Sequence, residues 1–383
     1  MPDHLGGGVG ESEPPPQLIV MLRILHIASL SICVVLAADP PGVARITEIG
    51  GVLHRNAAGQ IVEADLTFAW LADDDLALLA AMPELRKINL SHTKITDIGL
   101  AHLRPLQKVT QLICYYCDYI TDGGIAYLKQ WRNLESLNLR GTEITSRVFE
   151  HLASMKRLRM LDVGFSRVND DGFDALANLE ALEELHIGGD KMSGLALPLL
   201  RLLPSLKRLD VNGSQRTDSG RWGLMLTDVN FESITELTRL EELNMGGTNV
   251  SDVGIKGITA LLNLQALDLS RMELTAKGLE PLARLPKLGR LNLSECERID
   301  DSAAEALLAL KNVEILDLSG TAITDAVFER ITAMSALKTV FVNSPNITPA
   351  AVERFRKARP NCRVIYTPKF KEVKSPEDTR LTG

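Results

Sequence analysis

The chain has 383 residues, of which 45% are apolar and 24% charged, a composition that predicts a folded protein with a substantial core. Its net charge of −7 argues against a strongly basic surface of the kind that binds nucleic acid, so no nucleic-acid partner is expected. Five scattered cysteines are too few for a disulfide scaffold, and seven dispersed histidines show no metal-ligand spacing, so neither a metal nor a cofactor is expected.

The N-terminal part of the sequence divides into two segments. Residues 1–20 are rich in Gly and Pro, which predicts disorder or sequence upstream of the true start, with Met21 as the alternative start. Residues 21–38 place Arg23 before an apolar run that ends in small residues, which is typical of a cleaved secretory signal peptide. We therefore expect a secreted or periplasmic protein, without a stable membrane span after cleavage. The alternatives are a membrane anchor, lipidation at Cys33, and a cytoplasmic chain in which this stretch is no signal.

A capping hairpin is predicted next, over residues 43–60. Apolar and polar residues alternate from Arg45 to Val62 around a turn signal at Asn56–Gly59. The hairpin would cover the open edge of the repeats that follow, because an unpaired strand edge invites aggregation.

Residues 61–361 consist of twelve consecutive units with one pattern. Eight units have 24 residues, three have 25 and one has 34, which accounts for all 301 residues. Aliphatic residues at positions 1, 4, 6 and 11 of each unit predict a short strand with one buried side, and apolar residues at 16, 19 and 22 predict a helix with one buried face. Position 12 holds a helix-capping residue in eleven units, and Asp often follows it near the positive end of the helix dipole. The units begin at Ile61, Leu85, Val109, Leu134, Leu158, Leu182, Leu206, Leu240, Leu264, Leu288, Val313 and Leu337.

The order L-x-x-L-x-L-x-x-[T/C]-x-I-T-D-x-G resembles the leucine-rich repeat family over about four fifths of the chain. It is closest to the cysteine-containing subclass, since Cys117 and Cys296 stand at position 9, where other units have Thr. The resemblance implies a curved α/β solenoid of about 12 repeats of 24–25 residues, with a concave parallel β-sheet and convex helices. It also implies a non-enzymatic, monomeric scaffold that engages a protein, or a glycan, through the concave face. The signal-like segment and short units are similar to secreted bacterial members.

A second function follows from the same subclass, whose eukaryotic members are often ubiquitin-ligase adaptors. The alternative reading is therefore an intracellular adaptor or inhibitor of that type. About 20 residues separate the signal-like segment from the first unit, which leaves no room there for a recognisable F-box.

Departures from the repeat pattern mark the candidate partner-binding residues. Positions 7 and 8 are small in most units but carry large side chains in the second to fifth units, and Tyr and Arg are enriched in binding hot spots. Ordinary surface aromatics are the alternative interpretation. The candidates are His92, Tyr115, Tyr116, Arg140 and Phe165.

The long seventh unit carries ten extra residues, predicted as an insertion at 215–224 on the strand side. Its Arg216, Arg221 and Trp222 complete the candidate site, unless Trp222 simply packs on the neighbouring unit. At the C-terminal end, residues 362–383 are predicted to form a capping strand and a disordered tail.

Two further patterns have mainly structural interpretations. Position 5 alternates Asp with Asn or His, so that two carboxylates are not neighbours on adjacent strands. This pattern predicts a ladder of polar side chains that stabilises the sheet. Binding of a cation or a polar ligand is the alternative. Cys114 and Cys117 form a C-x-x-C pair but occupy core positions 6 and 9, which predicts packing rather than redox catalysis. No catalytic residue is expected.

Overall fold

The computed structural model describes residues 39–213, 215–217 and 220–367. The segments predicted as disordered (1–20) and as a signal peptide (21–38), and the tail beyond Thr367, lie outside the described residues. The repeats lie in the second of two units into which the chain divides, the one that begins at Pro41. Within the described part of the chain, no helix is long and apolar enough to cross a membrane.

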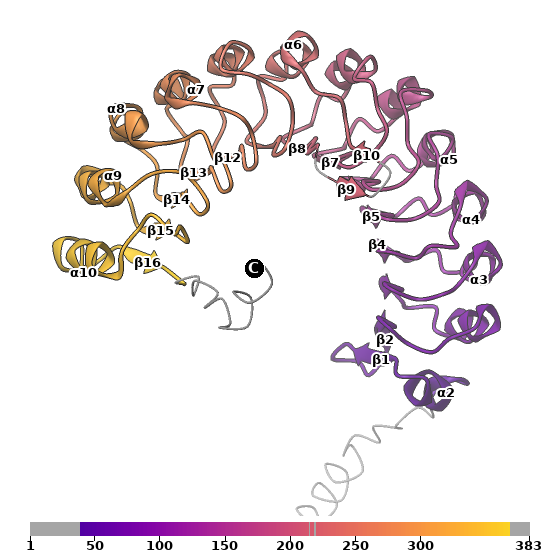
Figure 1. The fold of residues 1–383 in the computed structure, drawn as a ribbon. Coiled ribbons are helices and arrows are strands. Elements are labelled where there is room, and N and C mark those ends of the chain that lie inside the picture. Colours follow the sequence, from indigo (N-terminus) through magenta and orange to yellow (C-terminus); the bar gives the residue numbers. More distant parts are fainter. Residues whose placement is uncertain (1–38, 214, 218–219, 368–383) are drawn as a thin grey trace, which may run out of the picture. The chain divides into compact units, whose positions relative to one another are not determined.

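One sheet of 14 strands runs through the second unit, with strands in chain order apart from the β9–β10 pair (Figure 1). From the second repeat on, each repeat adds one short strand parallel to the strand of the repeat before it, and within this sheet of the described residues β1 pairs antiparallel with β2. The strands are β1 (Val52–Arg55), β2 (Ile61–Asp65), β3 (Lys87–Asn89), β4 (Gln111–Ile113), β5 (Ser136–Asn138), β6 (Met160–Asp162), β7 (Glu184–His186), β8 (Arg208–Asp210), β11 (Glu242–Asn244), β12 (Ala266–Asp268), β13 (Arg290–Asn292), β14 (Ile315–Asp317), β15 (Thr339–Phe341) and β16 (Arg363–Ile365).

Short α and 3-10 (η) helices line the outer side of the arc in Figure 1, with the strands on its inner side. Helices need about 8–10 Å of lateral room and strands only about 4.8 Å, so the stack bends toward the sheet. The α-helices are α2 (Val43–Glu48), α3 (Asp97–His102), α4 (Asp122–Tyr127), α5 (Val148–Leu152), α6 (Asp228–Thr235), α7 (Ala276–Leu279), α8 (Ala304–Leu308), α9 (Asp325–Arg330) and α10 (Pro349–Ala358). The 3-10 helices are η1 (Asp73–Ala81), η2 (Phe173–Asn178), η3 (Leu197–Leu202), η4 (Gly254–Ala260), η5 (Glu280–Arg284), η6 (Asp301–Ala303) and η7 (Ile331–Ala333).

The core lies between the sheet and the helices and is built from the aliphatic positions of the repeat. In the eleventh unit, Val313, Leu316, Leu318 and Ile323 are all buried, and the corresponding residues are buried along the solenoid. Full burial of such a side chain contributes about 1.5–3 kcal/mol relative to exposure. The predicted curved solenoid of twelve repeats, with a concave parallel sheet and convex helices, is confirmed.

The polar column at position 5 shapes the turn that follows each strand. In nine units its carboxylate or amide oxygen accepts a hydrogen bond from the backbone N–H two residues later, as Asp317 does from Ser319 at 2.8 Å. Asp and Asn are suited to this Asx turn because their side chains reach the backbone two residues on. Asn292 also donates to Asp268 on the neighbouring strand at 2.7 Å. The column is therefore a structural device, as the ladder interpretation predicted.

In most units, an Asp at position 13 ties the unit to the next. Thr121 donates its backbone N–H and its hydroxyl to the two oxygens of Asp97, at 2.8 and 2.5 Å, and the same paired bonds occur at seven junctions in all. We call this arrangement the Asp clamp. It explains the Gly of T-D-x-G, because a Cβ on Gly124 would lie 2.5 Å from Asp97 Oδ1. The Asp side chain lies near the positive end of its own helix dipole, as expected, but it accepts hydrogen bonds from the neighbouring unit.

The N-terminal cap differs from the hairpin predicted over 43–60. Residues Val43–Glu48 form α2, and only β1 remains as a capping strand. β1 pairs with β2, the strand of the first repeat, through the expected turn at Asn56–Gly59. Alternation from Arg45 onward suggested a strand, but Ile46 is fully buried from a helix. The repeat itself thus supplies the second arm of the hairpin.

The C-terminal cap closes the twelfth unit with α10 and β16. As predicted, β16 adds beside β15. The guanidinium of Arg359 donates to the backbone carbonyls of Thr332, Met334 and Leu337 at 2.7, 2.7 and 2.9 Å. A single side chain therefore satisfies carbonyl groups that a further repeat would otherwise have to cover.

Candidate partner-binding site

Position 8 of the repeat adopts a left-handed backbone conformation in ten units. There its N–H donates to the carbonyl of position 7 in the next unit, for example from Tyr116 to Arg140 at 2.8 Å. Glycine adopts this conformation freely, whereas other residues lose roughly 1–2 kcal/mol. Four of the ten are glycine, and the other six are Phe68, His92, Tyr116, Phe165, Arg271 and Glu295, with φ between 52° and 59°.

Three of these strained residues stack into a row, which we call the aromatic ladder: Phe68, His92 and Tyr116. The Phe68 and His92 rings lie 4.5 Å apart and the His92 and Tyr116 rings 5.7 Å apart, both pairs within 3° of parallel. Tyr115 packs edge-on against His92 and Tyr116. The fourth unit keeps its glycine because a Cβ on Gly141 would lie 2.7 Å from the Tyr116 ring. The structure thus brings together three predicted site residues, His92, Tyr115 and Tyr116.

Two exposed aromatic side chains of the first unit, Phe68 and Trp70, were missed by sequence reasoning. Phe68 is 68% and Trp70 90% exposed, and Tyr119 is also exposed. Phe68 stands at position 8 of the first unit, in line with His92, so the alignment of units contained the signal. A shallow hollow of about 350 Å³ lies beside the ladder. It is lined by His92, Thr93, Lys94, Tyr116, Asp118 and Tyr119.

Arg140 and Phe165 form a second, more rigid group next to the ladder. The Arg140 guanidinium lies 4.1 Å from the centre of the Phe165 ring, and Arg140 pairs with Asp162 at 3.6 Å. Only 19% of the Arg140 side chain is exposed. A cation over a ring face and a carboxylate hold the guanidinium in place, so Arg140 presents a fixed rather than a free charge.

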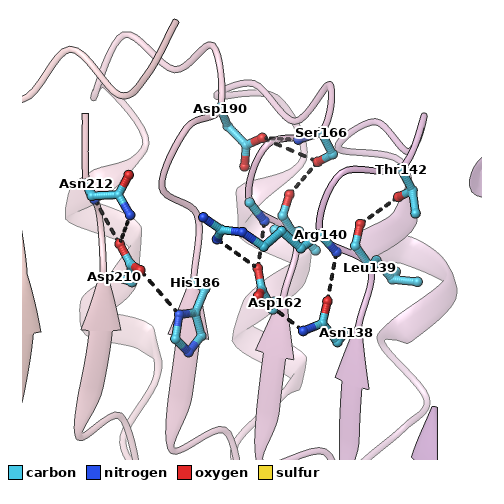
Figure 2. A network of polar contacts seen from close by, with 12 residues as sticks. Asn138, Leu139, Arg140, Thr142, Asp162, Ser166, His186, Asp190, Asp210 and Asn212 are labelled. Atoms are coloured by element: carbon cyan, nitrogen blue, oxygen red, sulfur yellow. Dashed lines mark hydrogen bonds and ion pairs between the residues drawn. The ribbon is translucent and has the colours of Figure 1, made fainter. Parts of the chain in front are cut away.

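A charged network crosses the concave face beyond Arg140 (Figure 2). His186 stands at position 5 in place of Asp or Asn, and its ring contacts Glu184 at 2.7 Å and Asp210 at 3.5 Å. Burial disfavours the imidazolium, but hydrogen bonds to Asp210 and Glu184 and the charge of Asp162 raise the pKa of His186 to about 10. The bond from His186, against partial burial, lowers the pKa of Glu184 to about 2. This part of the face therefore carries a fixed imidazolium among carboxylates at neutral pH.

Asp190 lies behind this network at position 9, where six other units have Thr or Cys. Its Oδ1 accepts the Ser166 backbone N–H at 2.7 Å, and its Oδ2 has no hydrogen-bond partner among the described residues (Figure 2). The side chain is fully buried. Burial raises the pKa of Asp190 well above its usual range, because an ionised carboxylate loses its hydration there.

The seventh-unit insertion is a β-hairpin of β9 (Gln215–Thr217) and β10 (Gly220–Trp222) on the strand side of the arc (Figure 1). Only the backbone of Arg216, Arg221 and Trp222 is described, so their place in the candidate site stays a prediction. Leu224, the last residue of the predicted insertion 215–224, is buried in the core. Among the described residues, no group of His, Cys, Asp or Glu could hold a metal ion.

Comparisons with known proteins agree with this architecture. A family model described as Leucine Rich repeat matches residues 82–103 and 284–308. The chain is similar to an internalin (inlF) from Listeria monocytogenes, with 20% identity and a TM-score of 0.50 over 82% of this chain and 92% of the internalin. It is also similar to a chain of the yeast Rad7 and Elc1 complex, with 17% identity and a TM-score of 0.57 over 95% and 97%. No curated protein matches the sequence.

The matched repeats and the parallel sheet with its outer helices show the fold of a leucine-rich repeat solenoid. The two solved structures support the fold and nothing finer, because their identity to this chain is low. Leucine-rich repeat proteins are generally non-enzymatic scaffolds that bind other proteins. The function of this chain has to be argued from its own surface.

Proposed function

We propose that this chain is a non-enzymatic scaffold that binds a protein partner through the aromatic ladder and the adjoining concave face. The observation that carries the proposal is the presence of aromatic rings at position 8, two of them exposed (Phe68 and His92), where the left-handed backbone disfavours them. Phe68 is 68% exposed, so burial of its ring does not offset the strain in the free protein. Strain that the fold does not require is a recurrent mark of binding surfaces.

The arrangement of the rings favours a protein over a glycan. Phe68, His92 and Tyr116 use their faces to stack on one another, which leaves mainly ring edges for a ligand. Ring edges carry the positive part of the aromatic quadrupole and attract the faces of other aromatic rings. They also attract oxygen acceptors such as backbone carbonyls. A glycan would need free ring faces to pack on. A polypeptide with aromatic side chains therefore fits this surface better.

The test replaces Phe68, His92 and Tyr116 together by glycine, the residue that position 8 carries in the fourth unit. Glycine relieves the strained backbone, so the triple variant is expected to fold. If each ring contributes about 1 kcal/mol or more, affinity falls by about 100-fold or more. The readout is capture of proteins from an extract, quantified by mass spectrometry.

The matched control is Arg271→Gly, which makes the same backbone change in the ninth unit. It is expected to capture the same partner as the unaltered protein. Equal capture by the folded triple variant would contradict the proposed site.

We further propose that the chain is an exported bacterial member of the cysteine-containing subclass. Support comes from the apolar run within residues 21–38 and from Cys117 and Cys296, both buried at position 9. N-terminal sequencing of the protein recovered outside the cytoplasm tests export, with a mature end near Ala38 or Asp39 as the expected result. A protein found in the cytoplasm with residues 1–38 still attached would instead favour the intracellular adaptor or inhibitor.

A further inference from the structure

Cys114 and Cys117 lie at the two ends of the turn that carries Tyr115 and Tyr116. The Cys117 backbone N–H donates to the Cys114 carbonyl at 3.2 Å. A hydrogen bond across four residues holds the outer Cα atoms within about 7 Å, and disulfides span about 4.4–6.8 Å between Cα atoms. Both side chains point into the core and are fully buried. The backbone therefore already has the separation that a cross-link needs.

The two thiols lie in the same buried part of the third unit. The interaction with Cys117 and burial raise the pKa of Cys114, whereas the interaction with Cys114 lowers the pKa of Cys117 against its own burial. Cys296, at the same position in the tenth unit, has Leu293 in place of the second cysteine, so only the third unit holds such a pair.

Forming a Cys114–Cys117 disulfide would remove one hydrogen bond to a buried carbonyl, but that carbonyl would keep another donor. The Cys117 thiol donates to the Leu90 carbonyl at 2.9 Å, and oxidation would remove this bond. The Thr93 hydroxyl donates to the same carbonyl at 2.6 Å and would remain. A buried carbonyl that keeps one donor avoids the cost of an unsatisfied polar group.

We propose that Cys114 and Cys117 form a disulfide across this turn when the chain folds in an oxidising environment. The oxidant is a low-molecular-weight disulfide. One cysteine thiolate attacks it, forms a mixed disulfide and releases one thiol; the second thiolate then attacks the mixed disulfide, closes the Cys114–Cys117 bond and releases the other thiol. Two electrons and two protons pass from the protein to the two released thiols. The bond fixes the segment that presents Tyr115 and Tyr116, and it forms whether or not the ladder binds a protein.

The reaction belongs to folding, because both sulfurs are inaccessible once the third unit is packed. The reduced, denatured protein is refolded with oxidised and reduced glutathione, denatured again without reductant, alkylated and digested with trypsin. We expect the peptide 109–129 to escape alkylation and to weigh two hydrogen atoms less than its reduced form. The peptide containing Cys296 is expected to be alkylated.

Two single variants keep the test interpretable. Cys114→Leu and Cys117→Thr restore residues found at the same positions in other units, such as Leu139 and Thr142, so both are expected to fold. In each, the remaining cysteine of the turn is expected to be alkylated like Cys296. Alkylation of both cysteines in the refolded unaltered chain, or a glutathione adduct without the internal cross-link, would overturn the proposal.

Discussion

Replacing Asp190 by Asn tests whether the buried carboxyl group is neutral in the folded protein. The side chain is fully buried, and its Oδ2 has no hydrogen-bond partner. Burial raises the pKa of Asp190 in the folded state, so the folded protein holds a proton that the unfolded chain releases above its ordinary pKa of about 3.9. The stability from this group is complete below the unfolded pKa and is lost as pH rises through the folded pKa. The loss is at most about 1.4 kcal/mol for each pH unit between the two values.

Asn keeps the shape of Asp190 and the acceptor for the Ser166 N–H but cannot ionise. We therefore expect Asp190→Asn to have nearly the stability of the unaltered protein near pH 4, and to become the more stable of the two as pH rises. Urea denaturation followed by circular dichroism between pH 4 and 8 measures the difference. A difference that does not change with pH, or a variant that loses relative stability toward neutral pH, would refute the reasoning.

Asp210→Asn is the control, because the sign of its effect is opposite. Burial opposes ionisation of Asp210, but its bond to His186 and the backbone N–H of Asn212 lower its pKa. Its contribution to stability is present above the unfolded pKa and is lost as pH falls through the folded pKa. The variant is therefore expected to be less stable than the unaltered protein at pH 7, with a smaller deficit in acid.

Two further substitutions test the structural devices of the repeat. Gly124→Ala places a methyl group 2.5 Å from Asp97 Oδ1 and should lower the free energy of unfolding by about 1–3 kcal/mol. Gly289→Ala is the control, because its nearest neighbours lie at 3.9 Å, and it should cost less than about 1 kcal/mol. Equal losses of the two variants in urea denaturation would contradict the Asp clamp. Arg359→Met removes the donor to the carbonyls of Thr332, Met334 and Leu337 and should lower the free energy of unfolding by about 2–3 kcal/mol. Arg363→Met is the control on the exposed side of β16 and should change the free energy of unfolding little. A loss below about 0.5 kcal/mol for Arg359→Met would contradict its capping role.

The repeat frame could be predicted from sequence because each aliphatic position recurs twelve times with the same neighbours. Leu316 and Leu318 are buried as expected, since residues two apart on a strand face the same side. The cap at Val43–Glu48 could not be predicted in the same way, because it occurs once and its short pattern suits either a strand or a helix.

The binding surface was predictable only in part. His92, Tyr115 and Tyr116 stood out as bulky residues, but residue type does not report the left-handed backbone at position 8, since six of its ten instances are not glycine. Phe68 occupies the same position in the first unit and could have been found from the alignment of the units. Arg140 stood out as a hot-spot residue, yet its packing against Phe165 and Asp162 depends on three-dimensional neighbours.

The Asp clamp ties neighbouring units unevenly along the solenoid. Its paired bonds occur at seven of the eleven junctions between units. Position 13 is Ser146 in the fourth unit, Gly194 in the sixth and Ala276 in the ninth, and in the fifth unit Asp170 accepts from two backbone N–H groups of the sixth instead. Stability in a repeat protein is carried by nearest-neighbour interfaces. Three of the four junctions without the clamp are consecutive, from the fourth unit to the seventh, so the stretch between the ladder-bearing units and the inserted hairpin is expected to open more readily than the clamped stretches on either side.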